Sequence, residues 1–353
     1  MARRIENLSQ MSPPSEFRNP TYQDMIHFAR KALGLSDSVA IEVSPLKGRG
    51  SDRVFFRLKW NRHDSAILIH YNSKRVENMY YADIATFLRN IDVPVPKPIR
   101  HDSTRFLAVM EDLGDTDLWS LRENPWEVRR SLYQKTLTAA YRLHAFPEGD
   151  FPSSRVRLME GFGSDLYHWE RDYFRHHFVR DACGIKLEPS FERELEAELS
   201  KLAERLMATK RSLVHRDLQS QNVMVRNGDP FFIDFQGMRF GSFFYDLGSL
   251  LCDPYVMFSD SERYELLSFY YELSKLEIDL TVFHDTFWEA SAQRLMQALG
   301  AYGFLGLKKG LKTYLNHIPG GLRSLHFAAT QVLSLRRLRE LTGECQRVID
   351  QRG

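Results

Sequence analysis

The sequence predicts an α+β protein with two lobes, a small β-rich N-terminal lobe and a large, mostly helical C-terminal lobe. Short apolar runs separated by turn residues fill the N-terminal part of the chain, whereas apolar residues at helical spacing dominate the rest. With 353 residues, of which 43% are hydrophobic, the chain can bury a core in each lobe. We place the lobes at residues 21–112 and 113–353, after a polar, flexible lead-in at residues 1–20.

Composition narrows the class of protein. The formal net charge is only +2, which does not favour nucleic acid as the main partner. Three widely spaced cysteines indicate reduced thiols rather than a disulfide framework or a zinc site. The polar N-terminus lacks the apolar core of a signal peptide, and no apolar run approaches the ~20 residues of a membrane span. We therefore predict a cytoplasmic protein that binds neither nucleic acid nor membranes.

The elements of the N-terminal lobe follow from local pattern. Thr21 is a suitable N-cap for a helix at residues 22–33, which Gly34 ends. Strands are predicted at residues 41–45, 54–60 and 65–71, with a glycine-rich turn between the first two, and a helix at residues 73–90. A further apolar strand at residues 105–110 then leads out of the lobe.

In the C-terminal lobe the pattern becomes helical. Helices are predicted at residues 126–144, 165–180 and 191–209, and four or five more between residues 261 and 353. Residues 223–225 and the apolar run before Asp234 read as two strands joined by Asn227, Gly228 and Asp229, which predicts a hairpin. Residues 235–241 read as a turn-rich loop. Asp246 follows near the start of the next helix, where we expect it to cap the helix and brace the preceding loop.

The open end of that hairpin carries the chemistry. His215, Arg216 and Asp217 are followed by Asn222 after five residues, and the second strand ends in Asp234. A carboxylate and an amide oxygen in one cleft suit Mg²⁺, so Asn222 and Asp234 are the predicted metal ligands. Asp217 is left to accept a proton from a substrate hydroxyl, as the catalytic residue. This spacing matches the catalytic loop and metal-binding Asp of kinases; a surface hairpin with polar ends is the alternative.

Two stretches of the N-terminal lobe are predicted to bind the nucleotide that such a loop would use. Gly48 and Gly50 would let backbone amides approach nucleotide phosphates, and Ser51 would add a hydroxyl; a plain hairpin turn is the alternative. Near Met110 and Asp112, where the chain passes between lobes, backbone groups would bond the edge of adenine; an ordinary exit from a strand is the alternative. These five residues complete the predicted nucleotide-binding set.

The chain resembles the superfamily of aminoglycoside phosphotransferases and choline kinases, which has the protein-kinase-like fold, and within it the bacterial N-acetylmuramate and N-acetylglucosamine kinases. The likeness runs from about residue 22 to 330. It rests on GRGSDRVFFRL, SAILIHY, VMEDLGDTDL, HRDLQSQNVMV, IDFQGMRFGSFFYDLGSLLCDPY and QRLMQALGAYGFL. The third predicted strand has no lysine to pair with a helix glutamate, and His70 stands near that place. The resembled sugar kinases also lack this lysine.

The resemblance implies a kinase of cell-wall recycling that uses Mg²⁺ and ATP, with GTP as an alternative donor. The implied acceptor is a small molecule, the anomeric hydroxyl of N-acetylmuramate or N-acetylglucosamine. Gln219, Gln236 and Arg294 are candidate contacts to it, and Arg294 would suit an acidic acceptor. Choline, homoserine, an aminoglycoside or a nucleoside are alternative acceptors. The missing strand lysine leaves open a nucleotide-binding pseudokinase scaffold, although intact Asp217, Asn222 and Asp234 argue against it.

Overall fold

The computed structural model describes residues 20–46, 53–72 and 75–351. The predicted lead-in at residues 1–20, all but its last residue, and the candidate phosphate contacts Gly48, Gly50 and Ser51 therefore lie outside the described residues. The chain divides into two compact units. One consists of Met1–Ala82 with Pro96–Asp112, and the other of Asp83–Val95 with Leu113–Gly353.

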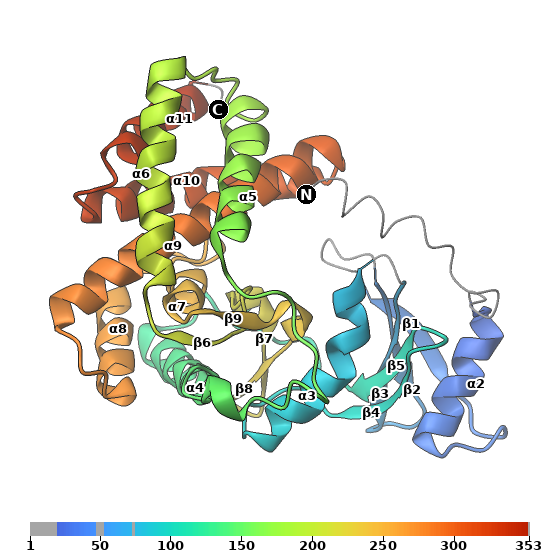
Figure 1. Ribbon diagram of the computed structural model, residues 1–353. Helices are drawn as coiled ribbons and strands as arrows, with labels where there is room; N and C mark the ends of the chain where they lie inside the picture. The colour runs from blue at the N-terminus through green and yellow to red at the C-terminus, as the bar shows by residue number, and fades with distance from the viewer. Residues whose placement is uncertain (1–19, 47–52, 73–74, 352–353) are drawn as a thin grey trace. The chain divides into compact units, whose positions relative to one another are not determined.

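The smaller unit is built on a five-stranded antiparallel sheet with strand order β1-β2-β3-β5-β4 (Figure 1). Its strands are β1 (Glu42–Leu46), β2 (Val54–Lys59), β3 (Ser65–His70), β4 (Pro98–Asp102) and β5 (Leu107–Glu111). Strands β3 and β5 expose no side chain fully to solvent, which explains why their sequences read as apolar runs rather than as alternating patterns.

Helix α2 (Tyr22–Leu33) packs against this sheet. Thr21 accepts a hydrogen bond from the backbone of Asp24, whose side chain bonds back to Thr21, and Gly34 ends the helix in the left-handed conformation. Phe28 and Ala29 on the helix join Leu58, Leu68 and Val109 of the sheet in one apolar cluster. The predicted helix with its two caps is thus confirmed.

The larger unit is mostly helical. Its longest helix among the described residues, α9, packs against α5, α7 and α10, so that α9 forms the centre of the unit (Figure 1). The helices are α4 (Trp126–His144), α5 (Ser164–Phe174), α6 (Pro189–Met207), α7 (Phe244–Leu251), α8 (Asp260–Ser274), α9 (Leu280–Gly303), α10 (Ile318–Gln331) and α11 (Arg336–Asp350). Helix α3 (Tyr81–Asn90) continues from the smaller unit into this one. Within the described ranges, no helix is long and apolar enough to cross a bilayer.

Two short antiparallel pairs carry the polar loops of this unit. Strand β7 (Val223–Arg226) pairs with β8 (Asp229–Phe232), and β6 (Arg211–Val214) pairs with β9 (Arg239–Ser242). Both residues between β7 and β8, Asn227 and Gly228, have positive φ, the backbone of a tight hairpin turn. The predicted hairpin is therefore confirmed. Its turn is shorter than predicted, because Asp229 already belongs to β8, and β8 ends at Phe232 rather than at Asp234.

Several local predictions were wrong. The helix predicted at residues 165–180 changes to a π-helical segment at Arg175–Arg180, where it faces a second π-helical segment at Phe304–Lys308. The helix predicted from residue 73 starts as a 3-10 helix at Val76–Tyr80. The loop predicted at residues 235–241 contains a 3-10 helix, Phe235–Gly237, and then β9, because β6 offers a partner that local sequence does not show.

Candidate active site

The loop after β6 brings the three predicted catalytic and metal-binding side chains together. The side-chain amide of Asn222 donates to the carbonyl oxygen of Asp217 at 2.9 Å, which closes the loop into a tight turn. The backbone amide of Ile233 donates to the carbonyl oxygen of Asn222 at 2.9 Å. The next residue, Asp234, therefore lies close to Asn222. His215 adds a bond from Nε2 to the carbonyl oxygen of Ile233 at 2.9 Å. Residues distant in the chain thus form one polar site at the open end of the β7–β8 hairpin.

Asp246, on α7, anchors the start of the loop through its backbone amides. Its two carboxylate oxygens accept hydrogen bonds from the backbone amides of His215, at 2.6 Å, and of Arg216, at 2.8 Å. The buried His144 donates from Nε2 to the same carboxylate at 3.1 Å, and its Nδ1 is hydrogen-bonded to the hydroxyl of Tyr270 at 2.7 Å. The predicted bracing of the loop is confirmed. The predicted helix cap is wrong, because Phe243 is the N-cap and makes no side-chain capping bond.

Asp253 anchors the other half of the loop. Its buried carboxylate accepts from the backbone amide of Ser220 at 2.7 Å, from the hydroxyl of Ser220 at 2.5 Å and from the backbone amide of Tyr255 at 3.0 Å. Burial raises the pKa of Asp253, and the bonds from Ser220 act in the opposite direction. Because Ser220 starts the 3-10 turn Ser220–Asn222, this contact orients Asn222. The sequence reasoning missed Asp253, because its contact with Ser220 joins residues 33 positions apart.

Asn222 and Asp234 suit a magnesium ion. Since Asn222 donates through its Nδ2, its Oδ1 is turned away from Asp217 and can serve as a ligand. Asp234 has a φ of 64°, a left-handed backbone that redirects the chain at the end of the hairpin. Magnesium typically takes one or two protein oxygens and completes its shell with water and substrate phosphates, which matches two oxygen-bearing side chains. The described residues contain no cluster of three or more His, Cys, Asp or Glu side chains that could hold a metal ion.

Asp217 lies between two arginines. Arg216 approaches one carboxylate oxygen at 3.3 Å, and Arg294 of α9 approaches the other at 3.3 Å. The side chain of Asp217 is 29% exposed, whereas that of Arg294 is 7% exposed. Burial opposes the charge of Arg294, but Asp217 and nearby tyrosines outweigh it and raise the pKa of the guanidinium. Arg294 therefore stays charged and holds the Asp217 carboxylate in place.

The predicted acceptor contacts Gln219, Gln236 and Arg294 all lie beside these carboxylates. Gln236 donates to Asp234 at 2.9 Å, and Gln219 accepts from Arg294 at 3.5 Å. Arg294 also donates to the hydroxyl of Ser249 at 3.1 Å and to the side-chain oxygen of Gln297. The guanidinium of Arg294 thus already has protein partners on all three of its nitrogens.

The nucleotide candidates of the smaller unit lie at the end of β5. Met110 is buried, and its backbone is paired with β3 and β4. The carboxylate of Asp112 forms a two-point ion pair with Arg57, at 2.7 and 3.1 Å. That ion pair commits the Asp112 side chain to holding the end of β5. His70 lies half-buried on β3, at the position noted for its missing lysine.

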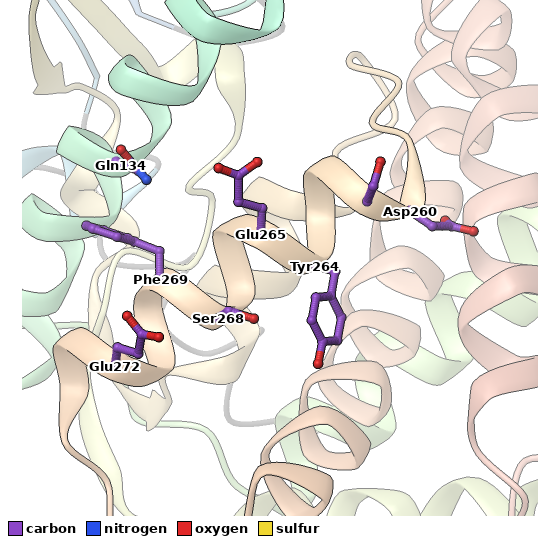
Figure 2. Close-up of a pocket in the computed structure, with 8 residues that line it drawn as sticks. Gln134, Asp260, Tyr264, Glu265, Ser268, Phe269 and Glu272 are labelled. Atoms are coloured by element: carbon purple, nitrogen blue, oxygen red, sulfur yellow. The ribbon is translucent and has the colours of Figure 1, made fainter.

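One hollow in the larger unit lies away from this site. It has a volume of about 750 Å³ and is lined by residues of α8 and by Gln134 of α4. Figure 2 shows Glu265, Phe269 and Glu272 projecting from α8 toward the side where Gln134 lies. No predicted catalytic or metal-binding residue lines it, so we do not assign it a role in the chemistry.

A family model identifies the class of protein that this fold and site define. The model of the phosphotransferase enzyme family (APH) matches residues 42–277, which include all of the described candidate residues except Arg294. The chain belongs to this family and is therefore a phosphotransferase, as the sequence predicted.

The individual relatives share less than a quarter of their aligned residues with this chain. An N-acetylmuramate/N-acetylglucosamine kinase of Pseudomonas aeruginosa is 23% identical over 317 residues, covering 88% of this chain and 90% of the relative. A kinase of the same name from Neisseria meningitidis is 24% identical over 240 residues, covering 66% of this chain and 70% of the relative.

Solved structures confirm the fold class. A Plasmodium vivax ethanolamine kinase aligns with a TM-score of 0.60 at 14% identity, covering 94% of this chain and 97% of the other. A ternary complex of streptomycin, ATP and an aminoglycoside phosphotransferase aligns with a TM-score of 0.57 at 15% identity, covering 82% and 92%. The predicted protein-kinase-like α+β fold is therefore confirmed.

Proposed function

We propose that the protein is an ATP-dependent kinase that phosphorylates a hydroxyl of an N-acetylated amino sugar, the anomeric hydroxyl of N-acetylmuramate or N-acetylglucosamine. The observation that carries this proposal is the loop in which Asp217 and Asn222 are tied together and set beside Asp234. The names of the two sugar-kinase relatives support the acceptor, and the ATP-bound structural relative supports the nucleotide. Under the same proposal, residues 21–112 bind nucleotide and residues 113–353 hold the acceptor.

Asp217 acts as the base in this proposal. Its carboxylate takes the proton of the acceptor hydroxyl as the oxygen bonds to the γ-phosphorus, while the bond from that phosphorus to the bridging oxygen of ADP breaks. Arg216 and Arg294 hold the carboxylate from both sides, which fixes its direction. Asn222 and Asp234 would hold Mg²⁺, which supplies charge neutralisation for the phosphates when it is bound. Gly48, Gly50, Ser51, Met110 and Asp112 are assigned to the nucleotide.

The test measures ADP release with Mg-ATP against N-acetylmuramate, N-acetylglucosamine, other hexosamines, choline and kanamycin. Asp217→Asn should lower kcat by at least ~100-fold while ATP still binds, because general-base removal costs about 10²–10⁴-fold. Asp234→Asn should instead weaken Mg²⁺-dependent binding of ATP. Asp285→Asn, at an exposed position on α9, is the matched control and should change neither quantity. Full turnover by the Asp217 and Asp234 variants would refute the assignment of the site.

A second candidate, a nucleotide-binding scaffold without turnover, rests on one observation. His70 occupies the part of β3 where a lysine would contact phosphates in protein kinases. ATP binding with no ADP release on any acceptor of the panel would favour this candidate. Sugar-dependent ADP release that Asp217→Asn abolishes would exclude it.

A further inference from the structure

Arg239 is a buried arginine beside the catalytic loop whose role the proposed function does not explain. It is the first residue of β9 and lies opposite Val214, the last residue of β6. The catalytic loop starts at the next residue, so the register places Arg239 near Arg216 and Asp217. The charges of both act on the Arg239 guanidinium. Local sequence does not show this proximity, because the pairing of β6 with β9 creates it.

Arg239 differs from the other buried arginines in its partners. Three arginines are buried among the described residues, Arg171, Arg239 and Arg294. Arg171 pairs with Glu196 at 2.9 Å, and Arg294 pairs with Asp217 at 3.3 Å. The residue Arg239 is only 7% exposed, yet it forms no ion pair with any residue of the described ranges. A buried cation without a protein anion is costly, which points to an anion supplied from outside.

The orientation of Arg239 leaves its terminal nitrogens available. Its Nε donates to the carbonyl oxygen of Gly237 at 3.0 Å, and its guanidinium lies 5.6 Å from the ring centre of Phe162. These two contacts fix the plane of the group. The terminal nitrogens make no hydrogen bond within the described chain, yet they are absent from its fully buried unpaired atoms, so they reach solvent. A fixed guanidinium with two open donors is the geometry that receives a carboxylate through two parallel bonds.

The charged groups that act on Arg239 are Arg216, Asp217 and Glu170. The carboxylate of Asp217 is already shared with Arg216 and Arg294, each at 3.3 Å. Glu170 is fully occupied, since it accepts from the hydroxyl of Tyr245 and from Gln293, each at 2.9 Å. Burial raises the pKa of Glu170. Burial also lowers the pKa of Arg239 to about 10, so the guanidinium stays charged at neutral pH.

We propose that the terminal nitrogens of Arg239 bind a carboxylate of the acceptor, so that the enzyme selects an acidic amino sugar over a neutral one. This inference rests on the proposed function and names the substrate class within it. N-acetylmuramate carries such a carboxylate and N-acetylglucosamine does not. A cationic acceptor such as choline or an aminoglycoside would instead meet the like charge of Arg239. Arg294, whose nitrogens already have protein partners, is the less suitable residue for this contact.

The experiment compares kcat/KM for N-acetylmuramate and N-acetylglucosamine in wild type, Arg239→Gln and Arg239→Lys. Arg239→Gln should lower kcat/KM for N-acetylmuramate by about 10–100-fold, the range for losing a hydrogen-bonded charge, and change that for N-acetylglucosamine by less than about 3-fold. Arg239→Lys should fall between, because it keeps the charge but loses the two-point geometry. Arg211→Gln is the matched control, because Arg211 lies on β6, faces the ring of Phe240 at 5.8 Å and pairs with Glu148. Arg211→Gln should leave the ratio of kcat/KM for the two sugars unchanged.

Other outcomes separate this inference from the proposed function. Equal losses for both sugars in Arg239→Gln would overturn the inference, because Arg239 would then serve the transferred phosphoryl group or the loop. If wild type turns over neither sugar, the proposed function fails. Calorimetric binding of N-acetylmuramate and of its methyl ester, without nucleotide, then tests the subsite directly. Equal affinity for the acid and the ester in wild type would overturn it, and a preference for the acid that Arg239→Gln abolishes would support it. Far-UV circular dichroism of each variant verifies that it folds.

Discussion

The contact between Asp246 and the catalytic loop allows a quantitative prediction. In Asp246→Asn the side chain keeps its size, but one of its two oxygens becomes an amide donor. The oxygen is best placed toward the amide of His215, the shorter bond at 2.6 Å, which also keeps the bond from His144. The new amide then faces the backbone amide of Arg216, which now bonds the carboxylate at 2.8 Å. One charge-assisted hydrogen bond is lost and one buried donor is left without an acceptor.

The expected cost follows from these contacts. A hydrogen bond to a charged group contributes about 1.5–3 kcal/mol, and an unsatisfied buried donor adds to the loss, so the free energy of unfolding should fall by about 2–4 kcal/mol. Displacement of the Arg216 backbone also moves Asp217, and kcat should fall by about 10–100-fold because misplacement of about 1 Å costs on the order of 100-fold.

Urea denaturation followed by circular dichroism measures the first quantity, and ADP release with the best acceptor measures the second. Asp285→Asn again serves as control and should stay within about 0.5 kcal/mol of wild type. An Asp246→Asn protein with wild-type stability and wild-type kcat would show that the carboxylate does not hold the loop.

Three further changes test other parts of the larger unit. Burial raises the pKa of Glu170 above its ordinary 4.5, so as the pH rises above that value the unfolded chain loses this proton first and folding becomes less favourable. Glutamine carries no such proton, so the Tm of Glu170→Gln relative to that of wild type should increase as the pH rises from 4.5, and a decrease would contradict this. Gly303→Ala would place a methyl group 2.1 Å from a backbone carbonyl oxygen of the facing π-helical segment, and calorimetry should show a loss of about 2–3 kcal/mol. Gly149→Ala, with nothing within 4 Å, is its control. Asp253→Asn should raise the Mg²⁺ concentration that gives half-maximal activity several-fold, because its bonds to Ser220 orient the metal-binding turn; an unchanged Mg²⁺ dependence would refute that role.

The hairpin and the catalytic loop were predictable because their determinants are local. Asn227 and Gly228 both tolerate positive φ, so they select a tight turn whatever surrounds them. Asp217 and Asn222 lie within one loop, and the bond between them spans only five residues. Helix α2 was predictable for the same reason, since its caps are the residues next to it.

The strand β9 was not predictable, and Arg239 was missed with it. Four residues carry too little pattern to show a strand, and this one exists because β6 presents unpaired backbone groups beside it. The π-helical segment Arg175–Arg180, which follows α5, has a similar origin. Gly303 on α9 lies so close to the backbone of His177 that the two helices constrain each other.

The sequence by itself therefore determined the class of fold, the β-hairpin with the polar loop that precedes it, and the family. Each of these depends on residue types at short spacing, which local backbone geometry converts into structure. Only the tertiary structure decided which side chains surround Asp217. Arg294 lies on α9, Asp246 on α7 and Arg239 on β9. Their charged groups lie near the same loop because the apolar faces of these elements pack together. Packing brings distant charges into contact without leaving a pattern in the sequence near any one of them.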